Sequence, residues 1–157
     1  MFAFEDTLPH WINRLSFQIR SEAQKAFTEK GIDLTPEEWA ILMVIWSRGP
    51  QRMTELAATT FRDRTTVTRM IDRLVRKGLI ERQSSADDRR TVRIAVTPVG
   101  AAFEPEVMSV ITPLIARAMA GVTAEDASRV LAILRQVSAN LDAPGPPVSG
   151  DGGSPVA

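Results

Sequence analysis

The segment from Thr54 to Thr97 narrows the possible folds more than any other part of the sequence. It predicts two helices, over residues 54–60 and 64–77, followed by two strands, over residues 79–83 and 91–97. The longer helix has apolar residues at steps of three and four, and the last strand alternates apolar with other residues. Two adjacent helices followed by a hairpin make a winged helix-turn-helix. The sequence therefore predicts a mainly α, α+β fold with a small β-hairpin wing.

Long helical patterns flank this segment on both sides. Residues 9–30 form the first predicted helix, and a second begins with Thr35 as N-cap, Pro36 in the first turn and Glu38 closing a capping box. Thr54 and Asp63 are the N-caps that we predict for the third and fourth helices. Further helices are predicted to follow Thr97 and Thr123, and we expect the former to be interrupted or bent at Pro105 and Pro113.

Charge is distributed unevenly along a chain whose formal net charge is zero. Residues 48–93 contain twelve basic residues, eleven of them Arg, and six acidic ones, so that this segment carries +6 and the rest carries −6. The guanidinium fork of Arg fits phosphate and the guanine edge better than the ammonium of Lys does. The basic middle favours a nucleic-acid-binding surface, although a solvated helical face would give a similar run of charge.

Several classes of protein are excluded or disfavoured by what the sequence lacks. It has no Cys and a single His, His10, which excludes disulfides, thiolate catalysis and Cys-ligated zinc. We expect no metal, no cofactor and no enzymatic activity, because no Ser has a His partner nearby and no carboxylate pair stands beside a nucleophile. We find no secretory signal and no run of about 18 apolar residues, so a cytoplasmic protein without membrane contact is expected.

The helix over residues 64–77 is the candidate for contact with DNA. Its apolar residues share one face and leave Thr65, Thr66, Arg69 and Arg73 on an exposed one. Small hydroxyl side chains let a helix start approach a surface closely, and an Arg one turn later can reach a base edge. Taken alone, this pattern fits the polar outer face of a core helix equally well.

The predicted hairpin adds a second candidate contact. Its polar loop, SSADDRR, places Asp88 two residues before Arg90, where the carboxylate can orient the guanidinium. An Arg at the end of such a wing fits the narrow and negative minor groove. Together the helix and the hairpin favour DNA binding.

Four stretches of the sequence resemble the multiple-antibiotic-resistance regulator (MarR) family of bacterial transcription factors: LTPEEWAIL, MTELA, DRTTVTRMIDRLVRKGLIER and DDRRTVRIAVTPVG. The resemblance implies a homodimer in which the first, fifth and sixth helices interlock and two winged helices bind a pseudopalindromic operator. It implies that Arg73 lies near phosphate and that Asp88 steers Arg90 into the minor groove. It places these residues in the major groove: Thr65, Thr66, Thr68 and Arg69.

On this basis we expect residues 34–97 to form the DNA-binding domain, residues 1–33 and 98–142 the helical dimerisation region, and residues 143–157 a disordered tail. We expect a repressor that a small aromatic or phenolic effector releases from double-stranded DNA. The candidate DNA-binding residues are Thr54, Arg64, Thr65, Thr66, Thr68, Arg69, Arg73, Asp88, Arg89 and Arg90. The candidate effector-binding residues are His10, Trp11, Arg14, Trp39 and Met43, for which core packing is the alternative.

Two points remain open from the sequence. The family commonly has Gly near Phe61, and a Phe side chain disfavours positive φ, so we expect a different turn there or a longer third helix. The alternative function is a winged-helix module that binds protein rather than DNA. Such a module would more often expose apolar residues where this sequence has Thr65, Thr66 and Arg69.

Overall fold

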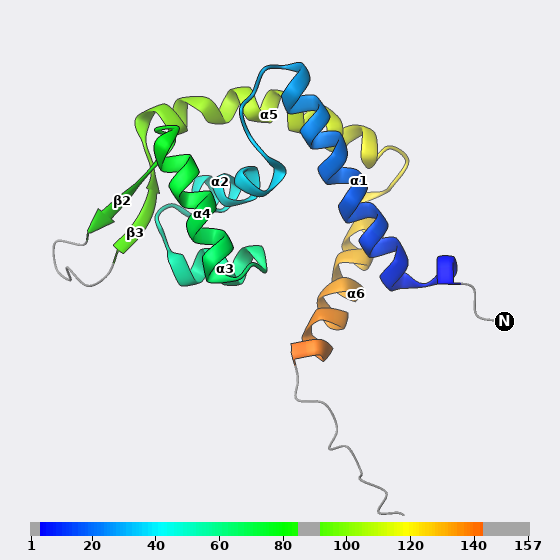
Figure 1. Ribbon diagram of the computed structural model, residues 1–157. Coiled ribbons are helices and arrows are strands. Elements are labelled where there is room, and N and C mark those ends of the chain that lie inside the picture. Colours follow the sequence, from blue (N-terminus) through cyan, green and yellow to red (C-terminus); the bar gives the residue numbers. More distant parts are fainter. Residues whose placement is uncertain (1–3, 85–91, 143–157) are drawn as a thin grey trace, which may run out of the picture. The chain divides into compact units, whose positions relative to one another are not determined.

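The computed structural model describes residues 4–84 and 92–142, and the chain divides into two units, Met1–Ala118 and Met119–Ala157, which we describe separately (Figure 1). The predicted contacts Asp88, Arg89 and Arg90 and the predicted tail lie outside the described residues. The second unit contains α6 (Ala124–Asp142). The first unit contains, in order, η1 (Phe4–Asp6), α1 (Leu8–Glu29), α2 (Pro36–Arg48), β1 (Gln51–Arg52), α3 (Met53–Thr60), α4 (Arg64–Arg76), β2 (Ile80–Ser84), β3 (Val92–Val96) and α5 (Pro98–Ala118).

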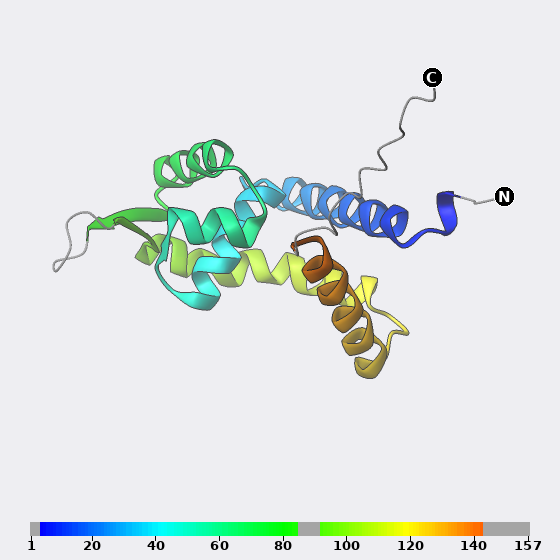
Figure 2. The same ribbon diagram turned by 90° about the horizontal axis from the view of Figure 1, so that it is seen from below.

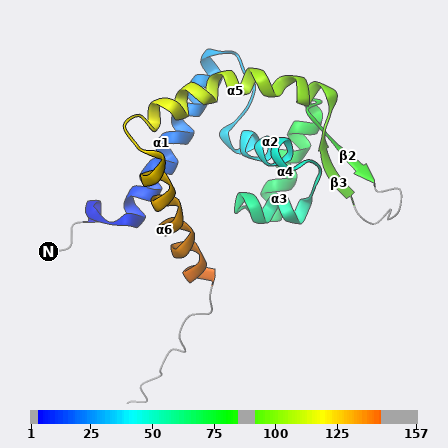
Figure 3. The same cartoon turned by 180° about the vertical axis from the view of Figure 1, so that it is seen from behind.

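The core of the first unit lies between α2, α3 and α4. Ile41 from α2, Leu56 from α3 and Leu74 from α4 are fully buried and belong to one apolar cluster. The cluster holds α2 and α4 side by side: α4 lies nearer the viewer in Figure 1, and α2 does in the reverse view of Figure 3. The stripe of apolar residues predicted for α4 faces this core, and the predicted fold class is confirmed.

The wing is an antiparallel sheet with the strand order β1–β3–β2. Ile80 pairs with Val96 and Arg82 with Ile94, and the hairpin extends outward from the helices in Figures 1 and 2. The strand β1, whose Gln51 pairs with Ile94, was not predicted because two residues are too short to show alternation. These pairings join the wing to the start of α3.

Most of the predicted helix starts are confirmed, and one is wrong. The Glu38 amide donates to Thr35 Oγ1 at 3.2 Å, and the Thr35 amide donates to Glu38 Oε2 at 3.1 Å. Thr54 is not an N-cap: α3 begins at Met53, and the Arg52 amide donates to Glu55 Oε2 at 2.7 Å. The carboxylate of Glu55 reaches back over the first turn and satisfies this free amide, so no Thr hydroxyl is needed there.

Of the two outcomes expected for the helix after Thr97, interruption by proline is wrong, because α5 runs without a break from Pro98 to Ala118, whereas a bend at Pro105 or Pro113 stays a prediction. A proline at position i removes one hydrogen bond, the one to the carbonyl at i−4. For Pro105 and Pro113 these carbonyls belong to Ala101 and Ser109, which are both exposed. Water can therefore satisfy them, and the helix continues.

The helix α5 is also long and apolar enough to cross a membrane by length and composition, contrary to the expectation from the sequence that no such segment exists. Its place in the fold identifies it as a core helix. Val107 and Ile111 are buried in the same cluster as the helix-turn-helix core, and the Glu22–Arg117 ion pair joins α5 to α1 at 2.6 Å.

The junction between the wing and α5 depends on Gly100. Thr97 Oγ1 donates to the Gly78 carbonyl at 2.6 Å and accepts from the Gly100 amide at 3.0 Å, so one hydroxyl both ties down the wing and caps α5. A Cβ atom on Gly100 would lie 1.9 Å from the carbonyl oxygen of Leu79. Only glycine allows the two backbones to approach this closely.

Phe61 departs from the expectation drawn from the sequence. It adopts φ 51° and ψ 43°, which is the left-handed region, and α3 ends at Thr60 without running longer. The turn therefore has the backbone shape usual for glycine, with a Phe side chain that is 85% exposed. The backbone strain of this residue is local to the turn between α3 and α4.

The helix α6 is organised differently from α4. Thr123 caps it, since the Asp126 amide donates to Thr123 Oγ1 at 3.1 Å. Over its described length, Ala124–Asp142, none of its side chains is buried. Val130, Leu131 and Ile133 are each more than half exposed. Among the described residues of α6, Ala127, Leu134 and Val137 are partly buried, and the other apolar side chains are exposed.

Candidate nucleic-acid interface

The outer face of α4 presents the polar side chains that the sequence predicts to contact DNA. Arg64, Thr65, Arg69 and Arg73 are exposed, and the hydroxyl-bearing Thr66 and Thr68 are partly exposed. The opposite face carries the buried residues Val67, Met70, Ile71 and Leu74, so core packing orients the helix and turns the polar face outward. The face has no exposed apolar residue, which argues against a protein-binding surface.

The start of α4 is fixed by Asp63. Its Oδ1 accepts from the Thr66 amide at 2.9 Å, and its Oδ2 accepts from the Thr66 hydroxyl at 2.6 Å. These hydrogen bonds, the one from the hydroxyl above all, lower the pKa of the Asp63 carboxyl below its ordinary value. Asp63 is therefore a charged cap, and the hydroxyl of Thr66 can act toward a ligand only as an acceptor.

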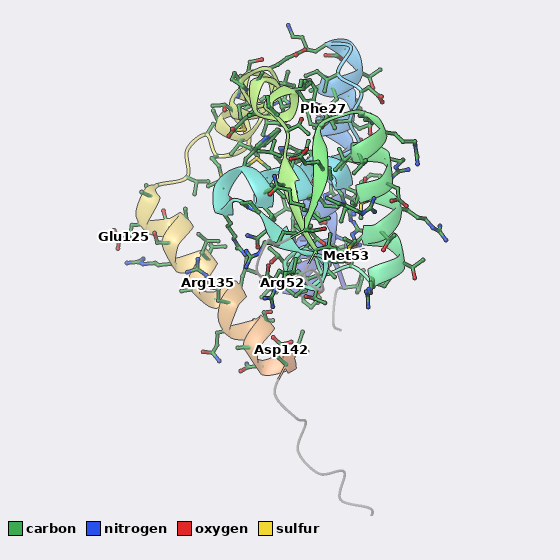
Figure 4. All side chains as sticks on the ribbon, turned by 90° about the vertical axis from the view of Figure 1, so that its left-hand side faces the viewer. Phe27, Arg52, Met53, Glu125, Arg135 and Asp142 are labelled. Atoms are coloured by element: carbon green, nitrogen blue, oxygen red, sulfur yellow. The ribbon has the colours of Figure 1, made fainter. Side chains whose placement is uncertain are left out.

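Two grooves lined by arginine flank α4. One, of about 550 Å³, lies toward the wing, and the other, of about 420 Å³, lies toward the start of α2. Figure 4, seen from the wing side, labels Arg52 and Met53 at the junction of β1 and α3, where the first groove begins. The first groove is lined by Arg52, Met53, Thr54, Arg64, Thr68, Arg82, Val92 and Ile94. The second is lined by Thr35, Glu37, Arg62, Thr66, Arg69, Met70 and Arg73.

The grooves bring together side chains that are far apart in the sequence. Thr54, Arg64 and Thr68, all predicted, meet in the first groove, and Thr66, Arg69 and Arg73 meet in the second. Sequence reasoning missed Arg52 and Arg82 in the first groove and Arg62 in the second. Their only signal was membership of the basic segment, because the residues opposite them belong to other elements. A helix flanked by positive grooves suits a DNA major groove between two phosphate strands.

The wing is tied to the recognition helix by an ion pair. Arg82 Nη2 on β2 lies 2.6 Å from Asp72 Oδ1 on α4. Both side chains are partly exposed, so the pair contributes little to stability, but it fixes the wing strands beside the helix. The two parts that would enter adjacent grooves of DNA are thereby linked.

Arg73 has a partner that the sequence did not predict. Its Nε lies 2.9 Å from Oε1 of Glu38, a side chain that is only 1% exposed. The guanidinium itself remains 47% exposed on the outer face of α4. The expected phosphate contact of Arg73 is therefore compatible with this structure only through its Nη atoms.

The candidate effector residues fall into two groups. His10, Trp11 and Arg14 gather at the start of α1, where the Arg14 guanidinium lies 5.5 Å from the Trp11 ring centroid. Trp39 and Met43 lie one turn apart on α2, and the Trp39 ring packs edge-on against Phe27. Since Phe27 follows Arg14 by thirteen residues, the groups are about 20 Å apart along α1. Within one chain they do not form a single pocket.

One atom of the second group is unusual. Trp39 Nε1 is buried and has no hydrogen-bond partner among the residues that the structure describes. A buried N–H donor without an acceptor is costly, and Trp39 Nε1 is such a donor. His10, Trp11 and Arg14 are accessible but carry no such unsatisfied group.

Comparison with known proteins identifies the family. The family model described as "MarR family" matches residues 34–92, the segment that contains α2, the helix-turn-helix and the wing. Over these residues the chain matches the MarR family. The match is to a family of transcriptional regulators that includes a repressor, and not to a family of enzymes.

Individual relatives match most of the length of the chain. It is 25% identical over 126 residues to YkoM, an uncharacterized HTH-type transcriptional regulator of Bacillus subtilis, covering 76% of this chain and 82% of YkoM. It is 24% identical over 141 residues to the HTH-type transcriptional repressor IacR of Pseudomonas putida, covering 90% and 83%. Both matches extend beyond the residues that the family model covers.

A solved structure supports the fold over nearly the whole described chain. BpsR of Bordetella bronchiseptica, whose DNA binding is regulated by 6-hydroxynicotinic acid, superposes with a TM-score of 0.75. The identity is 21%, and the match covers 88% of this chain and 97% of BpsR. At this identity the likeness establishes the MarR-like winged helix-turn-helix fold.

Proposed function

We propose that this MarR-family regulator is a cytoplasmic repressor that binds a pseudopalindromic operator as a homodimer. The observation that carries the proposal is the outer face of α4, where Thr65, Thr66 and Arg69 are presented between two arginine-lined grooves. Thr65 and Thr66 lie at the helix start, where side chains contact base edges when a recognition helix enters the major groove. The grooves on either side supply the phosphate contacts.

The dimer is supported by the apolar surface of the terminal helices. A single winged helix makes few base contacts, and two copies about 34 Å apart, one turn of DNA, double them. The uncovered apolar side chains of α1 and α6 offer the surface for pairing, because burying them removes a large apolar area from water. These side chains are Leu8, Trp11, Ile12, Leu15, Phe17, Ile19, Val130, Leu131, Ile133 and Leu141.

Arg69→Ala tests the proposed base contact. We expect the variant to lose about 1–3 kcal/mol per subunit of discrimination between the operator and random DNA, the value of one bidentate base contact. The operator is obtained by selection of a random duplex library with the wild-type protein, and affinities are measured by fluorescence anisotropy. Arg76→Ala is the matched control, since Arg76 is exposed two turns later on the same helix. This substitution should weaken binding to the operator and to random DNA equally. Equal losses for Arg69→Ala would reduce Arg69 to a phosphate contact.

Salt dependence tests DNA binding as such. Each neutralised phosphate makes the slope of log affinity against log salt more negative by about 0.9. The basic segment therefore predicts that the affinity for DNA decreases steeply as the salt concentration rises. A flat response, or the absence of any selected duplex, would contradict the proposed function.

We further propose that a small aromatic acid or phenol releases the DNA by binding beside Trp39. The unsatisfied Nε1 of Trp39 supplies a donor for a carboxylate or hydroxyl, and BpsR provides the precedent of regulation by 6-hydroxynicotinic acid. A panel of aromatic carboxylates should include compounds that raise the Tm of the wild type and weaken its DNA binding. Trp39→Phe should abolish both effects. Trp46→Phe is the control, because Trp46 Nε1 already donates to the Gly100 carbonyl at 3.2 Å.

A further inference from the structure

We infer that Glu38 is a positioning residue for DNA binding: its buried carboxylate aims the guanidinium of Arg73 so that the Nη atoms face a phosphate. The inference rests on the proposed function, because it assigns a role within the same surface. Glu38 was expected from the sequence only to close a capping box. Its carboxylate does this and also reaches the recognition helix.

Both oxygens of Glu38 are engaged. Oε1 accepts from Arg73 Nε at 2.9 Å, and Oε2 accepts from Lys77 Nζ at 3.0 Å and from the Thr35 amide at 3.1 Å. Lys77 in turn donates to the Asp33 carbonyl at 2.7 Å. One side chain therefore ties the start of α2 to Arg73 in the last turn of α4 and to Lys77, the residue that follows the helix.

Apolar packing alone does not explain this arrangement. Ile41 and Leu42 of α2 already bury a continuous apolar surface against α4, which holds the helices together. A buried carboxylate with cationic partners adds little net stability, since the cost of removing charges from water offsets their attraction. The Glu38–Arg73 ion pair instead adds orientation. An ion pair fixes how α4 is rotated about its axis, and apolar contacts fix this rotation less strictly.

The nitrogen atoms of the Arg73 guanidinium fall into one that binds Glu38 and two that do not. Glu38 uses the Nε edge, and among the described residues no other ion-pair or hydrogen-bond partner of the Arg73 guanidinium is found. Its two Nη groups are therefore left for an external acceptor, on a side chain that is 47% exposed. A guanidinium that is already held at its Nε edge has its Nη atoms in a fixed position. The side chain therefore loses less conformational entropy when the Nη atoms bind a phosphate.

Glu38→Gln tests the inference by the sign of its effect. The substitution keeps the size of the side chain and an acceptor for Thr35, but it removes the charge that orients Arg73. Removal of a negative charge should by itself strengthen binding to DNA. We expect the opposite, a loss of at least about tenfold in operator affinity, the order of one charge-assisted hydrogen bond. The slope of log affinity against log salt should become shallower by about 1.8 for the operator-bound dimer, the value of one phosphate contact per subunit.

Glu37→Gln is the matched control. Glu37 is the preceding residue, carries the same charge and lies 3.5 Å from Arg20 and 3.7 Å from Arg62, but it does not contact Arg73. We expect this variant to bind the operator more tightly than the wild type. If Glu38→Gln also binds more tightly, Glu38 merely neutralises Arg73 and the inference is overturned. Equal weakening by both variants would overturn it as well.

A double-mutant cycle separates positioning from folding. In the background of Arg73→Gln, the change Glu38→Gln should weaken operator binding no further, since the group on which it acts is gone. Additive losses would mean that Glu38 acts through the fold, against the inference. Circular dichroism establishes that each variant is folded at the assay temperature.

Arg73→Lys covers the case in which Glu38→Gln does not fold. A single ammonium cannot engage the carboxylate and a phosphate at separate edges, so we expect a loss of about tenfold in affinity, although the charge is kept. Binding at wild-type strength would overturn the inference. Failure of the proposed function is distinguishable, because then the wild-type protein itself selects no duplex.

Discussion

The helices α4 and α6 both carry an apolar stripe, but in the part of the chain that the structure describes α4 buries its stripe, whereas no residue of α6 is fully buried. Val67, Ile71 and Leu74 of α4 are fully buried, whereas Leu131 of α6 is 51% exposed and Leu141 is 82% exposed. The outward faces differ accordingly: that of α4 is polar and basic, and that of α6 is apolar. The helix-turn-helix unit is therefore complete as a fold and open toward DNA, while α6 needs a second surface to cover it.

The first prediction concerns the core under α4. Leu74→Ala should lower the free energy of unfolding by about 2–5 kcal/mol, because it leaves a cavity in a packed core. Denaturant unfolding at several protein concentrations measures this loss, which should be the same at each. Arg76→Ala, on the exposed face of α4, should change stability by no more than about 0.5 kcal/mol. A small loss for Leu74→Ala would break the comparison, since α4 would then be held no more firmly than α6.

The second prediction concerns the uncovered face of α6. Leu131→Asp should raise the dissociation constant of the proposed dimer by at least about tenfold, because a charge replaces an apolar side chain that pairing would bury. Analytical ultracentrifugation measures the change. Ala132→Asp is the control, as the neighbouring residue faces away from the stripe and should leave association unchanged. If both variants dimerise like the wild type, the stripe of α6 is not the interface.

The third prediction concerns the turn before α4. Phe61→Gly should raise the free energy of unfolding by about 0.5–1 kcal/mol, because relief of the left-handed strain outweighs the added entropy of the unfolded chain. Little burial is lost, since Phe61 is 85% exposed. Phe61→Ala keeps the strain and should not gain stability. The gain in stability should appear as a higher Tm in thermal unfolding, without any change in dimer dissociation. This result would show that the fold around α4 can be stabilised independently of the α6 surface.

The smallest expected effect is the acid response of Asp63. Because the pKa of this carboxyl is lowered in the folded state, its contribution is present above the ordinary carboxyl pKa and is lost as the pH falls through the lowered value. Asp63→Asn should therefore have a slightly lower Tm than the wild type near neutral pH, and the difference should vanish in acid. Melting curves across this pH range measure it. A difference that persists in acid would show that the charge of Asp63 is not responsible.

The sequence predicted those parts of the fold that depend on neighbouring residues. The cap formed by Thr35 and Glu38 and the cap formed by Asp63 each operate over three residues, so their pattern is visible in the sequence. Thr54 was misassigned because Glu55 offered a competing cap one residue away. The continuity of α5 through Pro105 and Pro113 depends on which carbonyls reach solvent, and this is decided by tertiary packing.

In the candidate interface, too, the features that depend on neighbouring residues were predicted, and those that depend on tertiary packing were not. The exposed face of α4 followed from helical periodicity, but the role of Arg73 did not, since its partner Glu38 precedes it by more than thirty residues. Arg52 and Arg82 join the groove beside α4 because β1 and β2 both pair with β3, and β1 was too short to predict. The predicted roles of Thr65, Thr66, Thr68 and Arg69 in the major groove remain predictions, and so do those of the wing residues.

The contact at Gly100 has a mechanical consequence. With no side chain between them, the start of α5 and the backbone of Leu79 have no room to slide or tilt against each other. The wing strands and α5 must therefore move together as one rigid body. Since α5 is about 31 Å long, a shift at its far end would reach the wing as a change of angle and not as a local deformation. Whatever moves Ala118 also steers β2 and β3.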